Sequence, residues 1–243
     1  MTYEERPSRV PGAVVWCRGA APPGTRGRVL PDGCMDLLLW DGELVVAGPD
    51  THAFESVERL GEPVTGLRLP PGAGPRVFGV RAHELRDQRV PLAAVWSGRE
   101  VRELSARVAG AADPATALEA VARRRLRAYE RAAPDPREAA LTDAVVAALR
   151  HGMSVAQVAA RVGLSERQLH RRCLDAFGYG AKTLARILRL RTALRLATAG
   201  TPLATTALRA GYADQAHFAR EVKSLAGVPV TELTRPPAPR PER

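Results

Sequence analysis

An internal repeat near the end of the chain constrains its fold more than any other sequence feature. The segment SVAQVAARVGLSERQLHRRCLDAFG (154–178) aligns with PLATTALRAGYADQAHFAREVKSLAG (202–227), offset by 48 positions before the central turn and by 49 after it. The matching pairs are Val155 and Leu203, Ala159 and Ala207, Arg161 and Arg209, Gly163 and Gly211, Leu169 and Phe218, Arg171 and Arg220, Cys173 and Val222, and Gly178 and Gly227. The repeat indicates that one supersecondary unit occurs twice.

Each copy has the pattern of a helix-turn-helix. A small residue, Ala159 or Ala207, lets two helices cross closely. A glycine, Gly163 or Gly211, permits the left-handed backbone of the turn between them. The periodicity predicts a second helix over about 165–177 in one copy and about 214–225 in the other.

The second helix of each copy has a capping residue and two distinct faces. Ser165 with Gln168 forms a capping box, and Asp214 is the corresponding cap. We expect the buried faces to carry Leu169, Cys173 and Phe177, and Phe218, Val222 and Leu225. The outward faces then carry Arg167, His170, Arg171 and Leu174, and Gln215, Ala216, Ala219, Arg220 and Lys223.

These outward side chains suit the major groove of DNA. Arginine pairs with guanine through two hydrogen bonds, glutamine pairs with adenine, and alanine contacts the thymine methyl group. The alternative is two solvated helix faces in a helical bundle, which explains neither the repeat nor the charge. Phosphate contacts are assigned to Arg172, Lys182, Thr205 and Lys223.

The positive charge is concentrated in the same part of the chain. The whole chain carries a net charge of +10, and residues 138–243 contain 16 Lys and Arg against 8 Asp and Glu. Residues 1–137 contain 20 against 18 and are nearly neutral. This distribution predicts a polyanion as the partner of the C-terminal part and a different role for the N-terminal part.

A helix is expected between the two copies, over AKTLARILRLRTALRLATAG (181–200). Its apolar side is formed by Leu184, Ile187, Leu188, Leu190, Ala193, Leu194 and Ala197, and Arg186, Arg189, Arg191 and Arg195 line much of the rest. A helix of about 18 residues is about 27 Å long, which could hold two reading helices roughly one duplex turn apart.

The first 95 residues have the texture of a β-rich domain. Short apolar runs at 13–17, 34–40, 43–48, 64–69 and 76–80 alternate with turn residues, which favours an antiparallel sandwich or barrel. Asp41-Gly42 is a hairpin signal. Helices follow at about 98–130. We therefore expect an α+β multidomain chain with a β-rich domain over 1–132, a linker over 133–137, an all-α domain over 138–235 and a disordered tail over 236–243.

GYADQAHFAREVK resembles the C-terminal signature of the AraC/XylS family of bacterial transcription regulators, and the resemblance extends over both units and the helix between them. The resemblance implies a sequence-specific regulator of transcription that binds promoter DNA. It also implies that the base-reading residues are Arg167, His170, Arg171, Gln215, Ala216 and Arg220. The sequence departs from the family pattern at Cys173 and Val222, where Phe is usual, at Ala181, and at Pro229. Three widely spaced cysteines and the lack of a visible signal peptide separately predict a cytoplasmic protein.

The N-terminal segments 30–51 and 64–96 resemble a poorly characterised domain found on some regulators of this family. Such domains are taken to be cupin-like β structures that sense a ligand or mediate association. We therefore expect a small-molecule effector here. The candidate pocket residues are Trp16, Cys34, Asp36, Trp40 and His52.

Other functions fit the sequence less well. The Cys and His residues of the N-terminal part are widely spaced, so neither a metal site nor a cofactor is expected. An Ada-type alkylation sensor needs four zinc-binding cysteines there, but only Cys17 and Cys34 are present. No catalytic motif occurs, so we expect no enzyme activity. An architectural DNA-binding protein would not need the neutral N-terminal half. RNA polymerase is a further candidate partner, a monomer and a homodimer both remain open, and no membrane association is expected.

Overall fold

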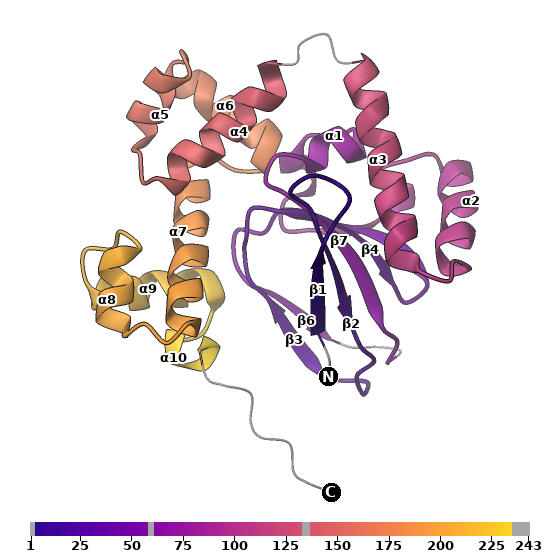
Figure 1. Ribbon diagram of the computed structural model, residues 1–243, viewed down its shortest axis with the longest axis horizontal. Coiled ribbons are helices and arrows are strands. Elements are labelled where there is room, and N and C mark those ends of the chain that lie inside the picture. The colour runs from indigo at the N-terminus through magenta and orange to yellow at the C-terminus, as the bar shows by residue number, and fades with distance from the viewer. Residues whose placement is uncertain (1–2, 58–60, 133–136, 235–243) are drawn as a thin grey trace, which may run out of the picture.

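The computed structural model describes residues 3–57, 61–132 and 137–234 (Figure 1). The expected linker lies outside the described residues except for Arg137, the first residue of a helix, and the expected tail over 236–243 lies outside them altogether. Within the described part, a β-rich region is followed by helices, so the expected fold class is confirmed.

The N-terminal region contains two antiparallel sheets. The larger sheet has the strand order β1-β2-β7-β4-β5-β8, and the smaller one pairs β3 with β6. The bounds in the larger sheet are β1 Tyr3–Pro7, β2 Val14–Arg18, β7 Val64–Leu69, β4 Met35–Trp40, β5 Glu43–Ala47 and β8 Arg89–Pro91. Strand β3 spans Arg26–Val29 and strand β6 spans Phe54–Val57. The expected hairpin joins β4 to β5, with both Asp41 and Gly42 at positive φ.

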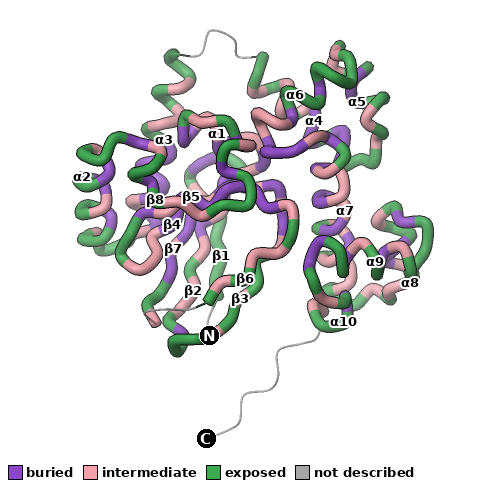
Figure 2. Tube along the Cα trace, turned by 180° about the vertical axis from the view of Figure 1, so that it is seen from behind, coloured by how far each residue is buried: buried purple, intermediate pink, exposed green. Residues whose placement is uncertain are grey.

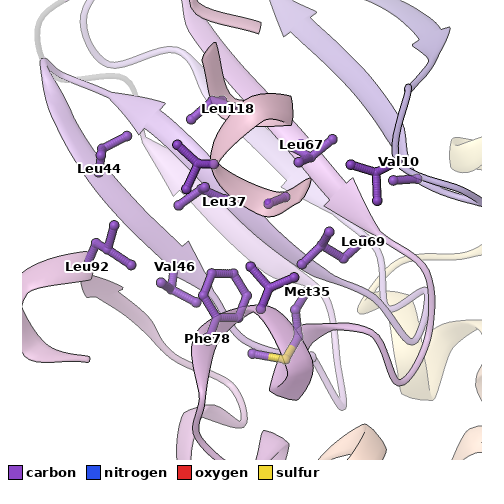
Figure 3. Close-up of a cluster of buried hydrophobic side chains, with 14 of the residues drawn as sticks. Val10, Met35, Leu37, Leu44, Val46, Leu67, Leu69, Phe78, Leu92 and Leu118 are labelled. Carbon is purple, nitrogen blue, oxygen red and sulfur yellow. The ribbon is translucent and has the colours of Figure 1, made fainter. Parts of the chain in front are cut away.

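One face of the larger sheet forms the hydrophobic core. Met35 and Leu37 of β4 and Leu67 of β7 are buried on this face, because alternate side chains of a strand point the same way. Leu118 of helix α3 (Pro114–Ala132) lies over Leu37 in Figure 3. Helix α2 (Gly98–Ala109) packs against α3 on the side away from the C-terminal helices (Figure 1). The hydrophobic core therefore lies on the face of the sheet that α3 covers.

The apolar run at 76–80 is a helix and not the predicted strand. Helix α1 spans Gly74–Phe78, with Pro75 in its first turn and Gly79 in the left-handed conformation at its end. Val77 and Phe78 are both buried although they are adjacent, which a one-sided strand does not allow. Two short 3₁₀ helices, η1 (Ala82–Leu85) and η2 (Leu92–Ala94), surround β8.

The C-terminal region consists of seven helices within its described residues. They are α4 Arg137–Arg150, α5 Val155–Arg161, α6 Glu166–Phe177, α7 Ala181–Thr198, α8 Leu203–Arg209, α9 Gln215–Ala226 and α10 Val230–Leu233. Helix α7 enters two separate hydrophobic cores: Ile187 is buried in the first, with α4, α5 and α6, and Ala193 in the second, with α8 and α9. Buried residues recur along α7 from Ala181 to Ala193 (Figure 2).

Replacing Phe218 by alanine tests the second core. Phe218 is fully buried against Tyr212, with the ring centroids 5.1 Å apart. We expect the free energy of unfolding to fall by about 3–5 kcal/mol, because the substitution leaves a cavity. Urea unfolding followed by circular dichroism measures the change. Leu208→Ala is the control, because Leu208 is 66% exposed, and equal losses in the two variants would contradict this packing.

Candidate nucleic-acid interface and sheet cavity

The first helix-turn-helix unit is formed by α5 and α6 and has the caps that its sequence predicts. The amide of Gln168 donates to Ser165 Oγ at 3.2 Å, and the Ser165 amide donates to Gln168 Oε1 at 2.9 Å. Gly163 in the turn has φ 69°. Leu169, Cys173 and Phe177 are buried as predicted. These contacts fix which face of α6 points outward.

The second unit, formed by α8 and α9, has an equivalent geometry. The amide of His217 donates to the Asp214 carboxylate at 2.6 Å, and Gly211 has φ 82° in the turn. The buried residues are Phe218, Val222, Leu225 and Ala226. Arg186 of α7 forms an ion pair with Glu221 at 2.7 Å, which anchors α9 to the central helix.

The six residues predicted to read bases are all exposed. They are Arg167, His170 and Arg171 on α6, and Gln215, Ala216 and Arg220 on α9. Their side chains make no hydrogen bond or ion pair with any residue in the part of the chain that the structure describes. The ring of His170 lies against Gly180, where an added Cβ would come 2.6 Å from Nδ1. Both outward faces are thus accessible to a ligand.

The residues predicted to contact phosphate differ in their surroundings. Lys182 and Lys223 are exposed, whereas Thr205 is half-buried. Arg172 forms an ion pair with Glu138 of α4 at 3.1 Å, and both side chains are about half exposed. Such an exposed pair is weak, so it can be exchanged for another anion at little cost.

A cavity of about 540 Å³ lies between the two sheets. Trp16, Asp36 and Trp40 line it, so three of the five predicted pocket residues come together. Cys34 and His52 are not among the lining residues. Burial raises the pKa of the Cys34 thiol well above its usual range, and His52 lies exposed beside Asp87.

Arg68 is the centre of the charged groups in this cavity. Its guanidinium lies 3.2 Å from Asp32, 3.0 Å from Glu5 and 3.7 Å from Asp36. Trp16 Nε1 donates to Asp36 at 2.6 Å, while Trp40 Nε1 is buried and has no hydrogen-bond partner among the described residues. Burial raises the pKa of Asp36 to about 6; the neighbouring Asp32 adds to this effect and Arg68 opposes it.

Sequence reasoning missed the cationic lining residues of the cavity, which are Arg18, Arg28, Arg68, Arg89 and Arg191. Arg191 belongs to α7, so the cavity wall includes a residue from the helical region. One sequence signal could have located the cavity: Gly66 lies inside β7, and glycine in a strand marks a close approach. A Cβ there would come 2.3 Å from the Trp16 ring. Among the described residues, no group of three or more His, Cys, Asp or Glu side chains could hold a metal ion.

No helix in the described part of the chain combines the length and the apolar character of a membrane span.

Two family models match the chain. Residues 158–235 match a helix-turn-helix domain of the AraC type, and residues 13–91 match a domain of unknown function, DUF6597. A search of curated proteins found no match.

Among solved structures, ToxT from Vibrio cholerae O395 is similar, with a TM-score of 0.48 and 10% sequence identity, covering 91% of this chain and 96% of that chain. The P21 form of Vibrio cholerae ToxT gives a TM-score of 0.46 at 10% identity, covering 96% and 98%. ToxT of Vibrio cholerae strain SCE256 bound to an unsaturated fatty acid gives 0.43 at 10% identity, covering 90% of each chain.

The raised pKa of Asp36 predicts a titration in the cavity near pH 6. Because Trp16 donates to this carboxylate, its fluorescence should change as Asp36 gains a proton, and Asp36→Asn should abolish the change. The folded chain holds this proton more tightly than the unfolded chain, so Asp36 favours folding increasingly as the pH falls from about 6 toward 4. Fluorescence and thermal unfolding across this range measure both effects.

Trp16→Phe is the control that assigns the fluorescence signal. A titration that survives in Asp36→Asn would show that another group causes it.

Proposed function

Because the chain is a DNA-binding transcription regulator with an AraC-type helix-turn-helix domain, we propose that it reads promoter DNA with both α6 and α9. Regulators of this kind act by binding DNA and not by catalysis. We assign the DNA-binding domain to residues 138–235 and the regulatory domain to residues 1–132. The proposed site of action is the cytoplasm, where bacterial promoters lie.

One observation carries this proposal: two matched helices each present an exposed, unpaired face above a buried one. Arginine and glutamine on these faces have the donor patterns that base edges in the major groove accept. Within a helix-turn-helix, the N-terminal residues of the second helix contact the bases. Arg167 and Arg171 lie in the first half of α6, and Gln215 and Arg220 lie in the first half of α9.

The length of α7 suits two contacts with one duplex. Its 18 residues span about 27 Å, and successive segments of the major groove are roughly 34 Å apart on one side of the duplex. We therefore propose that one chain contacts two segments of the groove. Selection of bound duplexes from a random pool with the whole chain tests this, because a bipartite motif is expected. Enrichment of only one short half-site would contradict it.

Alanine substitutions at Arg171 and Arg220 test the assignment of base contacts. Each should weaken binding to the selected duplex by about 1–3 kcal/mol and relax the preference at one base position. The assignment is measured by repeating the selection with each variant and by titrating single-base variants of the site.

Lys182→Ala and Lys223→Ala are the matched controls, since both residues are exposed and assigned to phosphate. These variants should weaken binding to all sequences alike and reduce the dependence of affinity on salt. If Arg171→Ala or Arg220→Ala behaved in the same way, that arginine would be a phosphate contact.

We further propose that a small molecule in the sheet cavity modulates DNA binding. Three observations support this proposal. The cavity has aromatic walls, Trp40 Nε1 is buried and has no hydrogen-bond partner among the described residues, and α7 contributes Arg191 to the lining. A compound that raises the melting temperature of the protein should then also change its affinity for the selected duplex. A broad metabolite screen that finds binders of the cavity without any effect on DNA affinity would contradict this proposal.

A further inference from the structure

The N-terminal region contacts the C-terminal end of both proposed recognition helices, α6 and α9. At the end of α6, Arg86 donates to the carbonyl of Gly178 at 3.4 Å, and a Cβ on Gly178 would come 2.6 Å from Pro49. His83 of η1 lies 3.5 Å from Asp175 of α6. The first recognition helix therefore ends against the segment that surrounds β8.

The end of α9 is held more tightly. The amide of Ala53 donates to the carbonyl of Leu225 at 2.7 Å, and the guanidinium of Arg28 donates to the carbonyl of Ala226 at 2.8 Å. The last carbonyls of a helix have no partner within the helix and carry the negative end of its dipole, so a guanidinium there is favourable. Two groups of the N-terminal region thus cap the second recognition helix.

Arg28 also belongs to the wall of the sheet cavity. It lies on β3, its side chain is 27% exposed, and its second anchor is Glu55 at 3.1 Å. Leu30, two residues further along the chain, lines the cavity as well and packs against the second helical core. Strands β3 and β6 form the part of the N-terminal region that faces α9 and α10 (Figure 2).

We propose that Arg28 is a positioning residue that links the sheet cavity to the second recognition helix. It holds the C-terminal end of α9, and any displacement of its guanidinium by an occupant of the cavity releases that end. This inference rests on the proposed function, because it describes how the cavity influences DNA binding. It adds the residue through which the influence passes.

The contact supports DNA binding and does not oppose it. The residues assigned to bases lie in the first half of each recognition helix, and the N-terminal region contacts the last residues of each helix. The reading faces stay exposed while both helices are held at the opposite end. A duplex contacted by both helices benefits from this, because two fixed contacts lose less freedom on binding than two mobile ones.

Arg28→Ala is compared with Arg26→Ala to test the inference. Arg26 lies on the same strand, is 77% exposed and pairs with Glu55 at 3.7 Å, but it neither lines the cavity nor contacts α9. Arg28→Ala should weaken binding to a duplex with both half-sites at least about fivefold, the lower range of measured coupling between sites. Arg26→Ala should bind as the unaltered chain does, and Arg28→Lys should retain most of the affinity because it keeps a cationic donor.

Hydrogen exchange of residues 221–230 in the DNA-free protein tests the cap without DNA. Exchange should be faster in Arg28→Ala than in Arg26→Ala, because the end of α9 loses a partner. Equal exchange in the two variants would overturn the cap, even if no duplex bound.

Fluorescence tests the link to the cavity, since coupling between two sites is reciprocal. Trp16 and Trp40 lie in the cavity, and Trp96→Phe removes the tryptophan in the hydrophobic core. In the Trp96→Phe variant, adding the selected duplex should change the fluorescence of Trp16 and Trp40. At saturating DNA, the additional substitution Arg28→Ala should abolish this change, whereas Arg26→Ala should leave it in place. No change in fluorescence before the Arg28 substitution, or the same change after it, would overturn the inference.

Unchanged or raised DNA affinity of Arg28→Ala would also overturn it. Failure of the unaltered chain to bind any duplex would instead contradict the proposed function itself.

Discussion

The burial of helix α7 is the interaction on which both recognition helices depend. Leu184 and Ile187 fill the first helical core, and Leu190 and Ala193 fill the second, so the two helix-turn-helix units share one rigid element. Protein interiors are packed as densely as organic crystals, so a shift of α7 in one core also displaces the side chains that it packs against in the other. Because Arg191 on the same helix lines the sheet cavity, α7 also adjoins the proposed regulatory site.

The larger sheet has two faces with different physical roles. Alternation along β4 directs Met35 and Leu37 into the hydrophobic core and Asp36 into the cavity. The charges on the second face tolerate burial only because they compensate each other around Arg68. Loss of one partner in such a cluster leaves an unpaired buried charge, which costs more than the pair contributes. The cavity is therefore a polar site built on a strand whose other side stabilises the fold.

The local parts of this structure could be predicted from the sequence, and the long-range pairings could not. Helical periodicity within a few turns predicts the buried faces of α6 and α9. The residue types of Ser165 and Asp214 predict the caps. The Asp36–Arg68 contact depends on β4 pairing with β7, where these two residues are register partners, and no local pattern specifies that pairing. Cys34 was predicted as a pocket residue together with Asp36, but it precedes β4, its thiol points back to the Asp32 carbonyl at 3.9 Å, and it is not among the residues lining the cavity.

The repeat extends beyond the helices to their surroundings. Each recognition helix ends at a left-handed glycine, Gly178 with φ 84° and Gly227 with φ 76°. At each end a guanidinium of the N-terminal region, from Arg86 or from Arg28, donates to a backbone carbonyl. The hydrogen bond from Arg28 is shorter than the one from Arg86 by 0.6 Å, and of these two arginines only Arg28 lines the cavity between the sheets. Two units that are alike in sequence are therefore held unequally, and the second is the one on which a change in the cavity acts directly.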